Sequence, residues 1–581
     1  MPASRPVTPS APHVDPALVS ALHGDLESSG YDVDGVEDLL GPVASAALHR
    51  EQALPARRVV EPVRAKDPRA ALVSLFLLGD AVPRAAVDRA LPATGAAGAE
   101  HLGLVRAAGT GPDDGVRAAV DLRPYGATDA SGDVRWWLAS DLGETATGSR
   151  LPSDHVLGAG GASLTLAQVT IRRSVTRVLD LGTGCGIQAL HAARHARDVV
   201  ATDISRRALA FAAFNAALNL DGDGRDDVAA DRTADRTADR RGAAARAARL
   251  DLRHGSMVEP VAGEQFDLVV SNPPFVITPH TGSAGAAVRA ALGDYEYRDG
   301  GRAGDDLVRE LVTGIGEALA PGGIAQMLVN WEHRRGETWH DRVGAWLDVA
   351  HERYGLDGWV IQREVLDPAE YAETWIRDGG TTPDREPAAW AGAYEAWLED
   401  FASRDVEAVG FGIVTLRRPG AVSGSGTSGA SADDGARRGG RERLRRLEEH
   451  GGSVRQPLGG HLAAVLDAHA WLATRGDDEV AVTRLVRAAD VTEERYLTPG
   501  SADPNVVILR QGDGLGRGVQ ASSPLAALVG TCDGELTVGQ IIGALAALFE
   551  VAAADLAAEL LPAVRGLVLD GFLVPAVHNG G

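Results

Sequence analysis

The sequence is short of cysteine and of long apolar runs, and each shortage excludes a class of protein. Of 581 residues only two are cysteine, Cys185 and Cys532, and neither belongs to a CxxC pair or a Cys/His cluster. Neither a structural zinc site nor a disulfide framework is therefore expected, and a reducing cytoplasm is the expected compartment. No apolar run reaches the length of about 18 residues that a membrane helix needs. The N-terminus also lacks the pattern of a signal peptide, so no membrane partner is expected.

Positive charge is also in deficit. The formal net charge is -23 at pH 7, and Lys66 is the single lysine. A nucleic-acid coat protein needs clustered positive charge, so this class is not expected, although a local basic patch stays open. Hydrophobic residues make up 45% and charged residues 24% of the chain, which excludes a wholly disordered, collagen-like or coiled-coil protein.

Composition and periodicity divide the chain into five parts. We expect a disordered lead over 1–16, a small α+β accessory or substrate-recognition domain over 17–150, a larger domain over 151–418, a Gly/Ser linker with a basic run over 419–449, and a further small domain over 450–577.

The two small domains show helical patterns followed by strand signals. In the first, strand-like runs at 115–126 and 133–142 flank a turn-rich segment, and in the second a helix is expected over 461–473. Helices followed by a hairpin or a short strand predict winged-helix-like domains at both ends. The arginines at 437–446 are interpreted as a solvated helix start, with an RNA- or acid-binding patch as the alternative.

The domain over 151–418 alternates apolar strands with helical runs. Seven segments are expected to be strands, among them RVLDLG, VVATDI and FDLVVSNPP. This pattern predicts an α/β, Rossmann-like, doubly wound fold with a mostly parallel sheet of seven strands. The charged, Ala-rich repeat at 221–249 is interpreted as a low-complexity loop insertion without chemistry.

The first chemical motif is VLDLGTGCGIQAL over 178–190. A strand carrying Asp180 turns through Gly182, Gly184 and Gly186 into a helix, and glycines there let the backbone approach a ligand closely. The spacing is G-x-G-x-G and not the G-x-G-x-x-G of dinucleotide binders, which argues against a dehydrogenase.

The second motif is VVATDIS, a strand that ends in Asp203. A carboxylate at the end of the next strand is well placed to accept from two ribose hydroxyls. The alternative is an N-cap for the helix that follows. Both roles are compatible if Ser205 caps the helix and Asp203 binds the ligand.

The third motif, FDLVVSNPPF over 266–275, is the most specific. Asn272 offers a side-chain carbonyl after a buried strand, and Pro273 and Pro274 fix the backbone, so that a main-chain carbonyl is held beside it. Two convergent acceptors suit a planar –NH2 group, and Phe275 offers a flat face for stacking on it. An ordinary Asn-Pro-Pro turn is the alternative.

Together these residues resemble the class I S-adenosylmethionine-dependent methyltransferases that carry an (N/D)PP(Y/F) motif. That branch includes the HemK-like glutamine N5-methyltransferases, the adenine N6-methyltransferases and the ribosomal-RNA guanine N2-methyltransferases. The resemblance implies S-adenosylmethionine as cofactor. It implies catalytic roles for Asn272, Pro273, Pro274 and Phe275, and cofactor contacts for Asp180, Gly182, Thr183, Gly184, Gly186, Asp203, Ile204, Ser256, Met257 and Asn272. At Ser256 and Met257 the sequence departs from the family, which often has an acid there.

The resemblance implies an N-methyltransferase whose mechanism needs no metal. In agreement with this, His254, His333 and His340 are interpreted as surface or satisfied core residues and not as metal ligands. The Gly-Gly and L-x-P-G-G segments after the motif resemble glutamine enzymes, whereas the stretch at 324–333 and Phe275 are closer to the guanine enzymes. A protein glutamine in a translation factor or ribosomal protein is the preferred substrate. A nucleobase amine in RNA or DNA, a small molecule and a catalytically idle cofactor-binding module are the alternatives.

The segment at 367–402 is an insertion in the expected fold and carries several aromatic residues. Core packing is the preferred interpretation of these side chains, and a substrate-recognition lid is the alternative. The residues concerned are Tyr371, Trp375, Trp390, Tyr394 and Trp397.

Overall fold

The computed structural model describes most of the chain. The described residues are 10–50, 52–129, 131–143, 147, 152, 154–220, 250–279, 285, 288, 301–420 and 442–576. They belong to two compact units, of which the first takes in 1–167, 173–421 and 446–449 and the second 168–172, 422–445 and 450–581. The expected loop insertion at 221–249 and the segment 421–441 of the expected linker lie outside the described residues.

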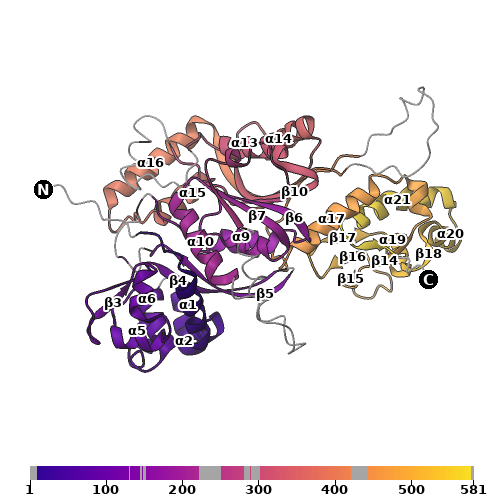
Figure 1. The fold of residues 1–581 in the computed structure, drawn as a ribbon. Helices are drawn as coiled ribbons and strands as arrows, with labels where there is room; N and C mark the ends of the chain where they lie inside the picture. Colours follow the sequence, from indigo (N-terminus) through magenta and orange to yellow (C-terminus); the bar gives the residue numbers. More distant parts are fainter. Residues whose placement is uncertain are drawn as a thin grey trace. The chain divides into compact units, whose positions relative to one another are not determined.

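A mixed sheet forms the centre of the first unit (Figure 1). Its strand order is β13-β11-β12-β10-β9-β6-β7-β8. The strands are β6 (Val175–Leu181), β7 (Ala196–Asp203), β8 (Leu250–His254), β9 (Phe266–Ser271), β10 (Leu319–Arg334), β11 (Asp357–Leu366), β12 (Val406–Arg417) and β13 (Arg445–Glu449). The run from β8 to β10 is parallel, and β12 lies antiparallel between β10 and β11. The expected α/β, Rossmann-like fold is thereby confirmed.

The strand order reverses at β6, because β7 and β8 lie on one side of it and β9 and β10 on the other. In an open α/β sheet, ligands bind in the crevice outside the carboxyl ends of the strands at such a switch point. The expected site residues Asp180, Asp203 and Asn272 all lie at the carboxyl ends of β6, β7 and β9.

The expectation of seven strands was wrong, since the described sheet has eight. The extra edge strand, β13, comes from the end of the basic run, which was expected to start a helix. The Arg446 guanidinium lies 5.4 Å from the ring centre of Trp359 on β11, and the Trp359 indole N–H donates to Glu448 at 2.6 Å. These contacts between distant parts of the chain hold the segment as a strand.

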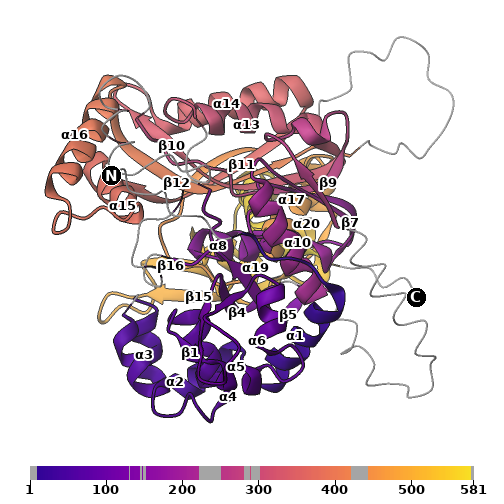
Figure 2. The ribbon, with the colours of Figure 1, turned by 60° about the vertical axis from the view of Figure 1, so that its left-hand side comes forward.

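Helices cover both faces of the sheet (Figure 2). On one face α13 (Asp306–Gly314) and α14 (Trp339–Tyr354) share a core with alternate residues of the strands, such as Leu179 and Leu181. On the other face lie α9 (Ile187–Ala193) and α10 (Arg206–Leu220). The 3₁₀ segments η2 (Glu259–Val261) and η3 (Ile315–Ala318), with α8 (Gly161–Val169), complete this part.

The N-terminal region of the first unit combines helices with short strands. Its elements are α1 (Pro16–Ser28), α2 (Val33–Leu48), α3 (Ala53–Val60), α4 (Pro68–Leu72), η1 (Val73–Leu77), β1 (Val82–Pro83), α5 (Arg84–Ala90), α6 (Gly95–His101), β2 (Val105–Ala107), β3 (Gly115–Ala118), β4 (Asp121–Asp129) and β5 (Gly132–Ser140). The small sheet has the order β1-β3-β2, and β4 and β5 form a separate hairpin. The strand-like run expected at 115–126 is thus divided between two sheets.

This N-terminal region is built into the core of the first unit, because one hydrophobic cluster contains residues of α1–α6, β4, β5, α9 and α10. Asn215 and Asn219 on α10 are buried, and their side-chain amides hydrogen-bond to the β5 backbone at Ala139 and Trp137. Because α9 and α10 also pack on the central sheet, they connect the N-terminal region to the site at its edge.

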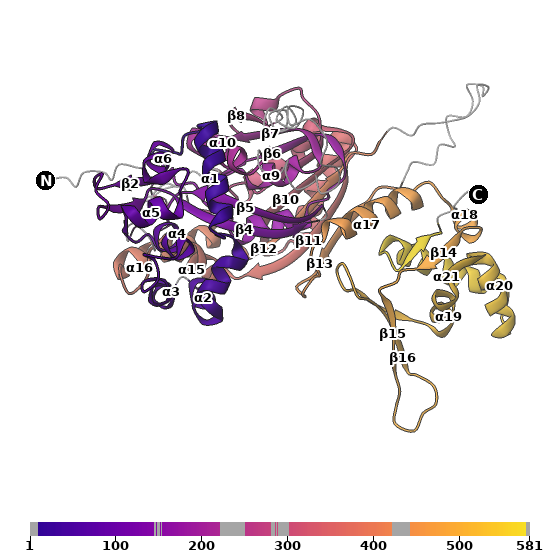
Figure 3. The ribbon, with the colours of Figure 1, turned by 60° about the horizontal axis from the view of Figure 1, so that its bottom comes forward.

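The second unit contains helices and two small antiparallel sheets. Its elements are α17 (Gly459–Leu472), α18 (Asp477–Ala481), β14 (Arg484–Arg487), β15 (Val491–Tyr496), β16 (Val506–Gln511), β17 (Gly518–Ala521), α19 (Ser523–Thr531), β18 (Asp533–Thr537), α20 (Val538–Leu548), α21 (Ala553–Leu569) and β19 (Leu573–Pro575). The sheets have the orders β18-β14-β19 and β15-β16-β17. The β15–β16 hairpin projects from this unit (Figure 3). No helix among the described residues of the chain has the length and hydropathy of a membrane span.

Candidate active site

The glycine-rich turn after β6 has open space beside its first two glycines. Gly182 and Gly184 have φ of 76° and 54°, in the left-handed region that disfavours other residues, and a Cβ added at either would meet no heavy atom within 4 Å beyond the chain neighbours. Gly186 is different, because a Cβ there would lie 3.0 Å from the Cα of Ala212 on α10. The first two glycines therefore leave room for a ligand, and the third allows α10 to approach.

The carboxylate of Asp203 closes one side of this turn. It accepts hydrogen bonds from the backbone N–H of Gly184 at 2.9 Å and of Ser205 at 2.8 Å. Burial raises the pKa of Asp203, although these N–H donors oppose that effect. Ser205 Oγ accepts from the N–H of Ala208 at 3.3 Å, so Ser205 caps α10. The Asp203 carboxylate at the end of β7 is therefore not needed as the cap, and its further lone pairs can accept hydrogen bonds from a ligand.

Asp180 lies beneath the turn and is buried. The hydroxyl of Thr183, itself buried, donates to its carboxylate at 2.6 Å, and burial raises the pKa of Asp180 to about 7. The backbone N–H groups of Gly182 and Thr183 both donate to the carbonyl of Thr202 on β7 at 2.9 Å. The turn is thus fixed from below by Asp180 and from the side by β7.

Three further residues expected at the cofactor lie beside Asp203. Ile204 follows it directly and is 57% exposed. Ser256 and Met257 follow β8, whose His254 is paired with Asp203 in the sheet register, and the Gly255 N–H donates to the Asp203 carbonyl at 3.0 Å. Ser256 is exposed, and Met257 is half-buried with φ of 48°.

Asn272 lies at the end of β9, close to the turn after β6. Ser271 is paired with Leu181 in the parallel register and donates its hydroxyl to the Leu181 carbonyl at 2.8 Å. The Asn272 Oδ1 atom is buried and accepts no hydrogen bond among the described residues. A buried acceptor without a donor costs about 1–3 kcal/mol, so this oxygen is suited to a ligand that brings an N–H or O–H group. Pro273 is buried beside it.

Pro274 and Phe275 follow and are half-buried. The Phe275 ring makes edge-to-face contacts with Trp375 and Phe411, each with ring centres 6.4 Å apart. Trp375 belongs to α15 (Pro368–Asp378) and Phe411 to β12. These neighbours fix the plane of the Phe275 ring while part of its surface stays accessible.

The insertion at 367–402 combines core residues with exposed ones. It forms α15 and α16 (Pro387–Ser403). Tyr371 and Trp397 are buried, and the Trp397 indole N–H donates to the Ile277 carbonyl at 2.8 Å. Trp390 and Tyr394 are half-buried and stack with ring centres 6.2 Å apart. Core packing therefore describes Tyr371 and Trp397, which lie against the segment after Phe275.

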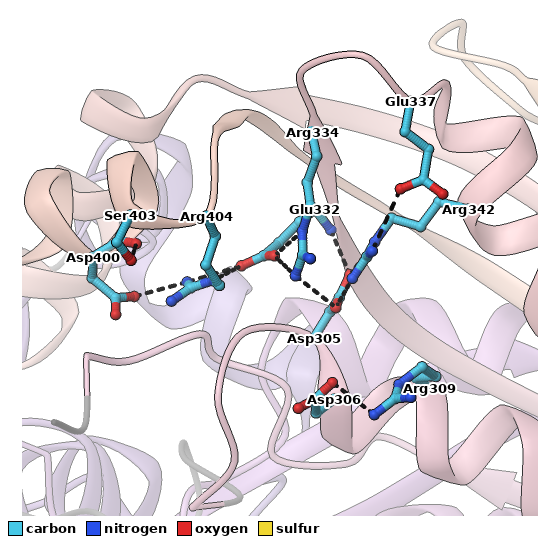
Figure 4. A network of polar contacts seen from close by, with 10 residues as sticks. All are labelled: Asp305, Asp306, Arg309, Glu332, Arg334, Glu337, Arg342, Asp400, Ser403 and Arg404. Atoms are coloured by element: carbon cyan, nitrogen blue, oxygen red, sulfur yellow. Dashed lines mark hydrogen bonds and ion pairs between the residues drawn. The ribbon is translucent and has the colours of Figure 1, made fainter.

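A buried ionic network fixes α16 to the sheet (Figure 4). Glu332, near the end of β10, is buried and accepts from Arg404 at 2.9 Å and from Arg334 at 2.8 Å. Asp305 is also buried and accepts from the Glu332 N–H at 2.9 Å and from Arg342 on α14 at 3.1 Å. Because Arg404 is the C-cap residue of α16, the network holds the insertion at a fixed place beside β10.

The structure adds Asn330 and Tyr371 to this region. Asn330 lies within the apolar strand β10, is buried, and donates from Nδ2 to the Tyr371 hydroxyl at 3.1 Å. An asparagine inside an apolar strand is a visible sequence signal, but its partner comes from the distant insertion. Among the described residues no group of three or more His, Cys, Asp or Glu side chains is arranged to hold a metal ion.

Three family models match parts of the chain. The model for ribosomal protein L11 methyltransferase (PrmA) matches residues 162–272, which contain the turn after β6, Asp203 and Asn272. Two models for domains of unknown function, DUF7059 and DUF7782, match residues 28–119 and 463–575.

The chain is similar to several curated glutamine methyltransferases. Release factor glutamine methyltransferases of Xylella fastidiosa and Deinococcus radiodurans are each 32% identical to it, over 29% and 33% of this chain and 53% and 65% of their own lengths. The ribosomal protein uL3 glutamine methyltransferase of Bradyrhizobium diazoefficiens is 31% identical over 34% of this chain and 54% of its own length. The chain thus spans between about half and two thirds of these relatives.

Solved structures give a more distant similarity. YcgJ of Bacillus subtilis covers 44% of this chain and 97% of its own length, with 14% identity and a TM-score of 0.24. An S-adenosylmethionine-dependent methyltransferase of Thiobacillus denitrificans, solved with S-adenosylhomocysteine, covers 43% of this chain and 88% of its own length, with 16% identity and a TM-score of 0.19.

Proposed function

We propose that this chain, which carries a class I methyltransferase domain, transfers the methyl group of S-adenosylmethionine to the side-chain amide nitrogen of a protein glutamine. The observation that carries the proposal is the buried Asn272 Oδ1, which has no hydrogen-bond donor among the described residues and lies next to the open turn after β6. The names of the curated relatives, which are glutamine methyltransferases, support glutamine as the acceptor.

The residues around the switch point fit S-adenosylmethionine. Gly182 and Gly184 leave an open cradle, the Asp203 carboxylate is suited to ribose hydroxyls, and the exposed Ile204 offers an apolar surface for a base. When bound, S-adenosylmethionine supplies an electrophilic methyl group on a positively charged sulfur. Asp180 supports this cradle through Thr183, so we assign it to the shape of the site.

Asn272 and Phe275 would hold the acceptor. An amide nitrogen is a poor nucleophile because its lone pair is delocalised into the carbonyl. Hydrogen bonds from both of its N–H groups, to Asn272 Oδ1 and to the Pro273 carbonyl, would orient the nitrogen, and stacking on Phe275 would fix its plane. Positioning of this kind lowers the displacement barrier substantially without a strong base. As the N–C bond forms, the methyl–sulfur bond would break, S-adenosylhomocysteine would leave, and one amide proton would pass to water.

We further propose that the substrate is a translation factor or a ribosomal protein in the cytoplasm, and that the N-terminal region helps to recognise it. The element order α4, β1, α5, α6, β2, β3 with the antiparallel sheet β1-β3-β2 supports a winged-helix-like arrangement there. The strongly acidic net charge of -23 favours a protein over a nucleic acid as the partner.

The test uses the full chain, S-adenosylmethionine labelled in the methyl group, and a lysate of the source organism. We expect label that protease releases and nuclease does not, and mass spectrometry should locate it on a glutamine side chain. The matched variant is Asn272→Ala, which should reduce transfer at least 100-fold while cofactor affinity stays within about twofold. Nuclease-sensitive label would assign a nucleobase amine instead, and full activity of Asn272→Ala would overturn the proposed role of this residue.

A further inference from the structure

A second unsatisfied acceptor lies close to the segment that follows Asn272. The Oδ1 atom of Asn330 is buried, and like that of Asn272 it accepts no hydrogen bond among the described residues. Asn272 follows β9, and Asn330 lies within the neighbouring parallel strand β10. Ser271 on β9 is paired with Met327 on β10, so Asn272 lies one residue and Asn330 three residues beyond that pair.

Hydrogen bonds connect Asn330 to the same segment. The Tyr371 hydroxyl accepts from Asn330 Nδ2 at 3.1 Å and from the backbone N–H of Ile277, two residues after Phe275, at 2.8 Å. One tyrosine oxygen therefore fixes the side chain of Asn330 and the chain that carries Phe275. Held at its Nδ2 end, the Asn330 amide has its carbonyl end left for another donor.

Aromatic contacts place Asn330 on the face of the sheet that carries Phe411 and Tyr371, whereas Phe275 contacts Phe411 and also packs against the core on the opposite face. Asn330 is paired with Phe411 on β12, and Phe411 contacts both Phe275 at 6.4 Å and Tyr371 at 5.8 Å between ring centres. The next residue, Trp331, belongs instead to the core beneath α13 and α14. Because side chains alternate along a strand, Asn330 faces the aromatic side chains and not that core.

We propose that Asn330 is a substrate-binding residue whose Oδ1 accepts an N–H group of the acceptor substrate, beside the acceptors at Asn272 and Pro273. The inference rests on the proposed function and extends it. The reacting –NH2 group brings two N–H donors, and a glutamine within a polypeptide brings further N–H groups on its backbone. A third buried acceptor therefore suits an acceptor that is part of a polypeptide.

The main variant is Asn330→Leu, which is close in volume and lacks the acceptor. Asn330→Leu also deletes the Nδ2 bond to Tyr371, so a change in melting temperature alone does not test the inference. If Asn330 only filled the core, transfer by the folded variant would be unchanged. We expect instead a 10- to 100-fold lower initial rate of methyl transfer to the lysate protein that becomes labelled, with cofactor affinity within twofold. A folded Asn330→Leu protein with transfer within twofold of the unsubstituted protein overturns the inference.

Asn330→Asp is the rescue variant. Buried at this position, the new carboxyl would have a raised pKa, and in its protonated form it keeps a carbonyl oxygen and a hydrogen-bonding group toward Tyr371. Its transfer should exceed that of Asn330→Leu and increase as the pH falls, relative to the unsubstituted protein. Equal transfer by both variants at every pH would contradict an acceptor role.

The same assay distinguishes a failure of the proposed role of Asn330 from a failure of the proposed function. Protease-sensitive label made equally well by the unsubstituted protein and Asn330→Leu would overturn the inference and leave the proposed function standing. Label only in nucleic acid, or no transfer by the unsubstituted protein to either class, would overturn the proposed function and with it the role of Asn330 toward a polypeptide.

Discussion

The carboxylate of Asp203 accepts a hydrogen bond of 2.9 Å from the backbone N–H of Gly184. Asp203 ends β7 and Gly184 lies in the turn after β6, so the bond joins the ends of two neighbouring parallel strands. A second connection runs from Ser271 on β9 to the Leu181 carbonyl. The three strand ends that carry the site are therefore fixed to one another by the protein itself, and little reorganisation is needed when a ligand binds.

Gly184→Ala should weaken cofactor binding more than it weakens the fold. The left-handed φ of 54° makes a Cβ unfavourable by about 1–2 kcal/mol, and the Cβ would project into the open space beside the turn, where we propose that the cofactor binds. Calorimetric titration with S-adenosylmethionine should show at least a tenfold loss of affinity. Gly186→Ala is the matched control. Its Cβ would clash with Ala212 at 3.0 Å, so it should lower the free energy of unfolding more than Gly184→Ala does.

Local signals in the sequence were sufficient for much of this site. The G-x-G-x-G turn, Asp203 and the Asn-Pro-Pro-Phe run are each contiguous, and each follows an apolar strand, so their chemistry and their common sheet edge could both be predicted. The contact between Asn330 and Tyr371 could not, because 41 residues separate them and only the packing of α15 on β12 brings them together. The edge strand β13 was missed for the same reason, since Trp359 and Glu448 are distant in sequence.

The stability of the ligand-free protein should depend on the ionisation of Asp180. Burial raises the pKa of Asp180 from 3.8 to about 7. A carboxyl with a raised pKa binds its proton more tightly in the folded state, so its contribution is complete below about pH 4 and is lost as the pH rises through about 7. Urea unfolding between pH 5 and pH 8 should therefore show a steeper loss of stability for the unsubstituted protein than for Asp180→Asn. Parallel pH profiles would contradict this assignment.

Glu332→Gln should destabilise the first unit strongly. The substitution removes a buried negative charge that pairs with Arg334 and Arg404 (Figure 4), and breaking a buried pair from one side costs about 3–5 kcal/mol. Glu337→Gln is the control, because Glu337 is 43% exposed and lies 3.6 Å from Arg342, so its loss should cost below about 1 kcal/mol. Denaturant titrations of both variants give the comparison, and equal effects would show that the network does not stabilise the fold.

Tyr125→Phe should destabilise the junction between the N-terminal region and the part of the first unit that contains the central sheet. The His191 side chain on α9 is buried, with Nδ1 2.8 Å from the Asp129 carboxylate and Nε2 2.8 Å from the Tyr125 hydroxyl. Removing the hydroxyl removes this buried hydrogen bond to Nε2, at a cost of about 1 kcal/mol. Tyr496→Phe in the second unit is the control, since Tyr496 is 53% exposed, and its effect should stay within about 0.5 kcal/mol.

The same substitution tests whether the N-terminal region and the cofactor site are coupled. Helix α9 begins directly after Gly186, so His191 connects the β4–β5 hairpin to the turn that would hold the cofactor. Cofactor binding stabilises only the folded site, and saturating S-adenosylmethionine should therefore recover part of the stability that Tyr125→Phe loses. Thermal unfolding with and without the cofactor measures this recovery. If the hairpin unfolds separately, the cofactor will raise the melting temperature of the part that contains the central sheet and leave that of the hairpin unchanged, and the N-terminal region would then be an independent module.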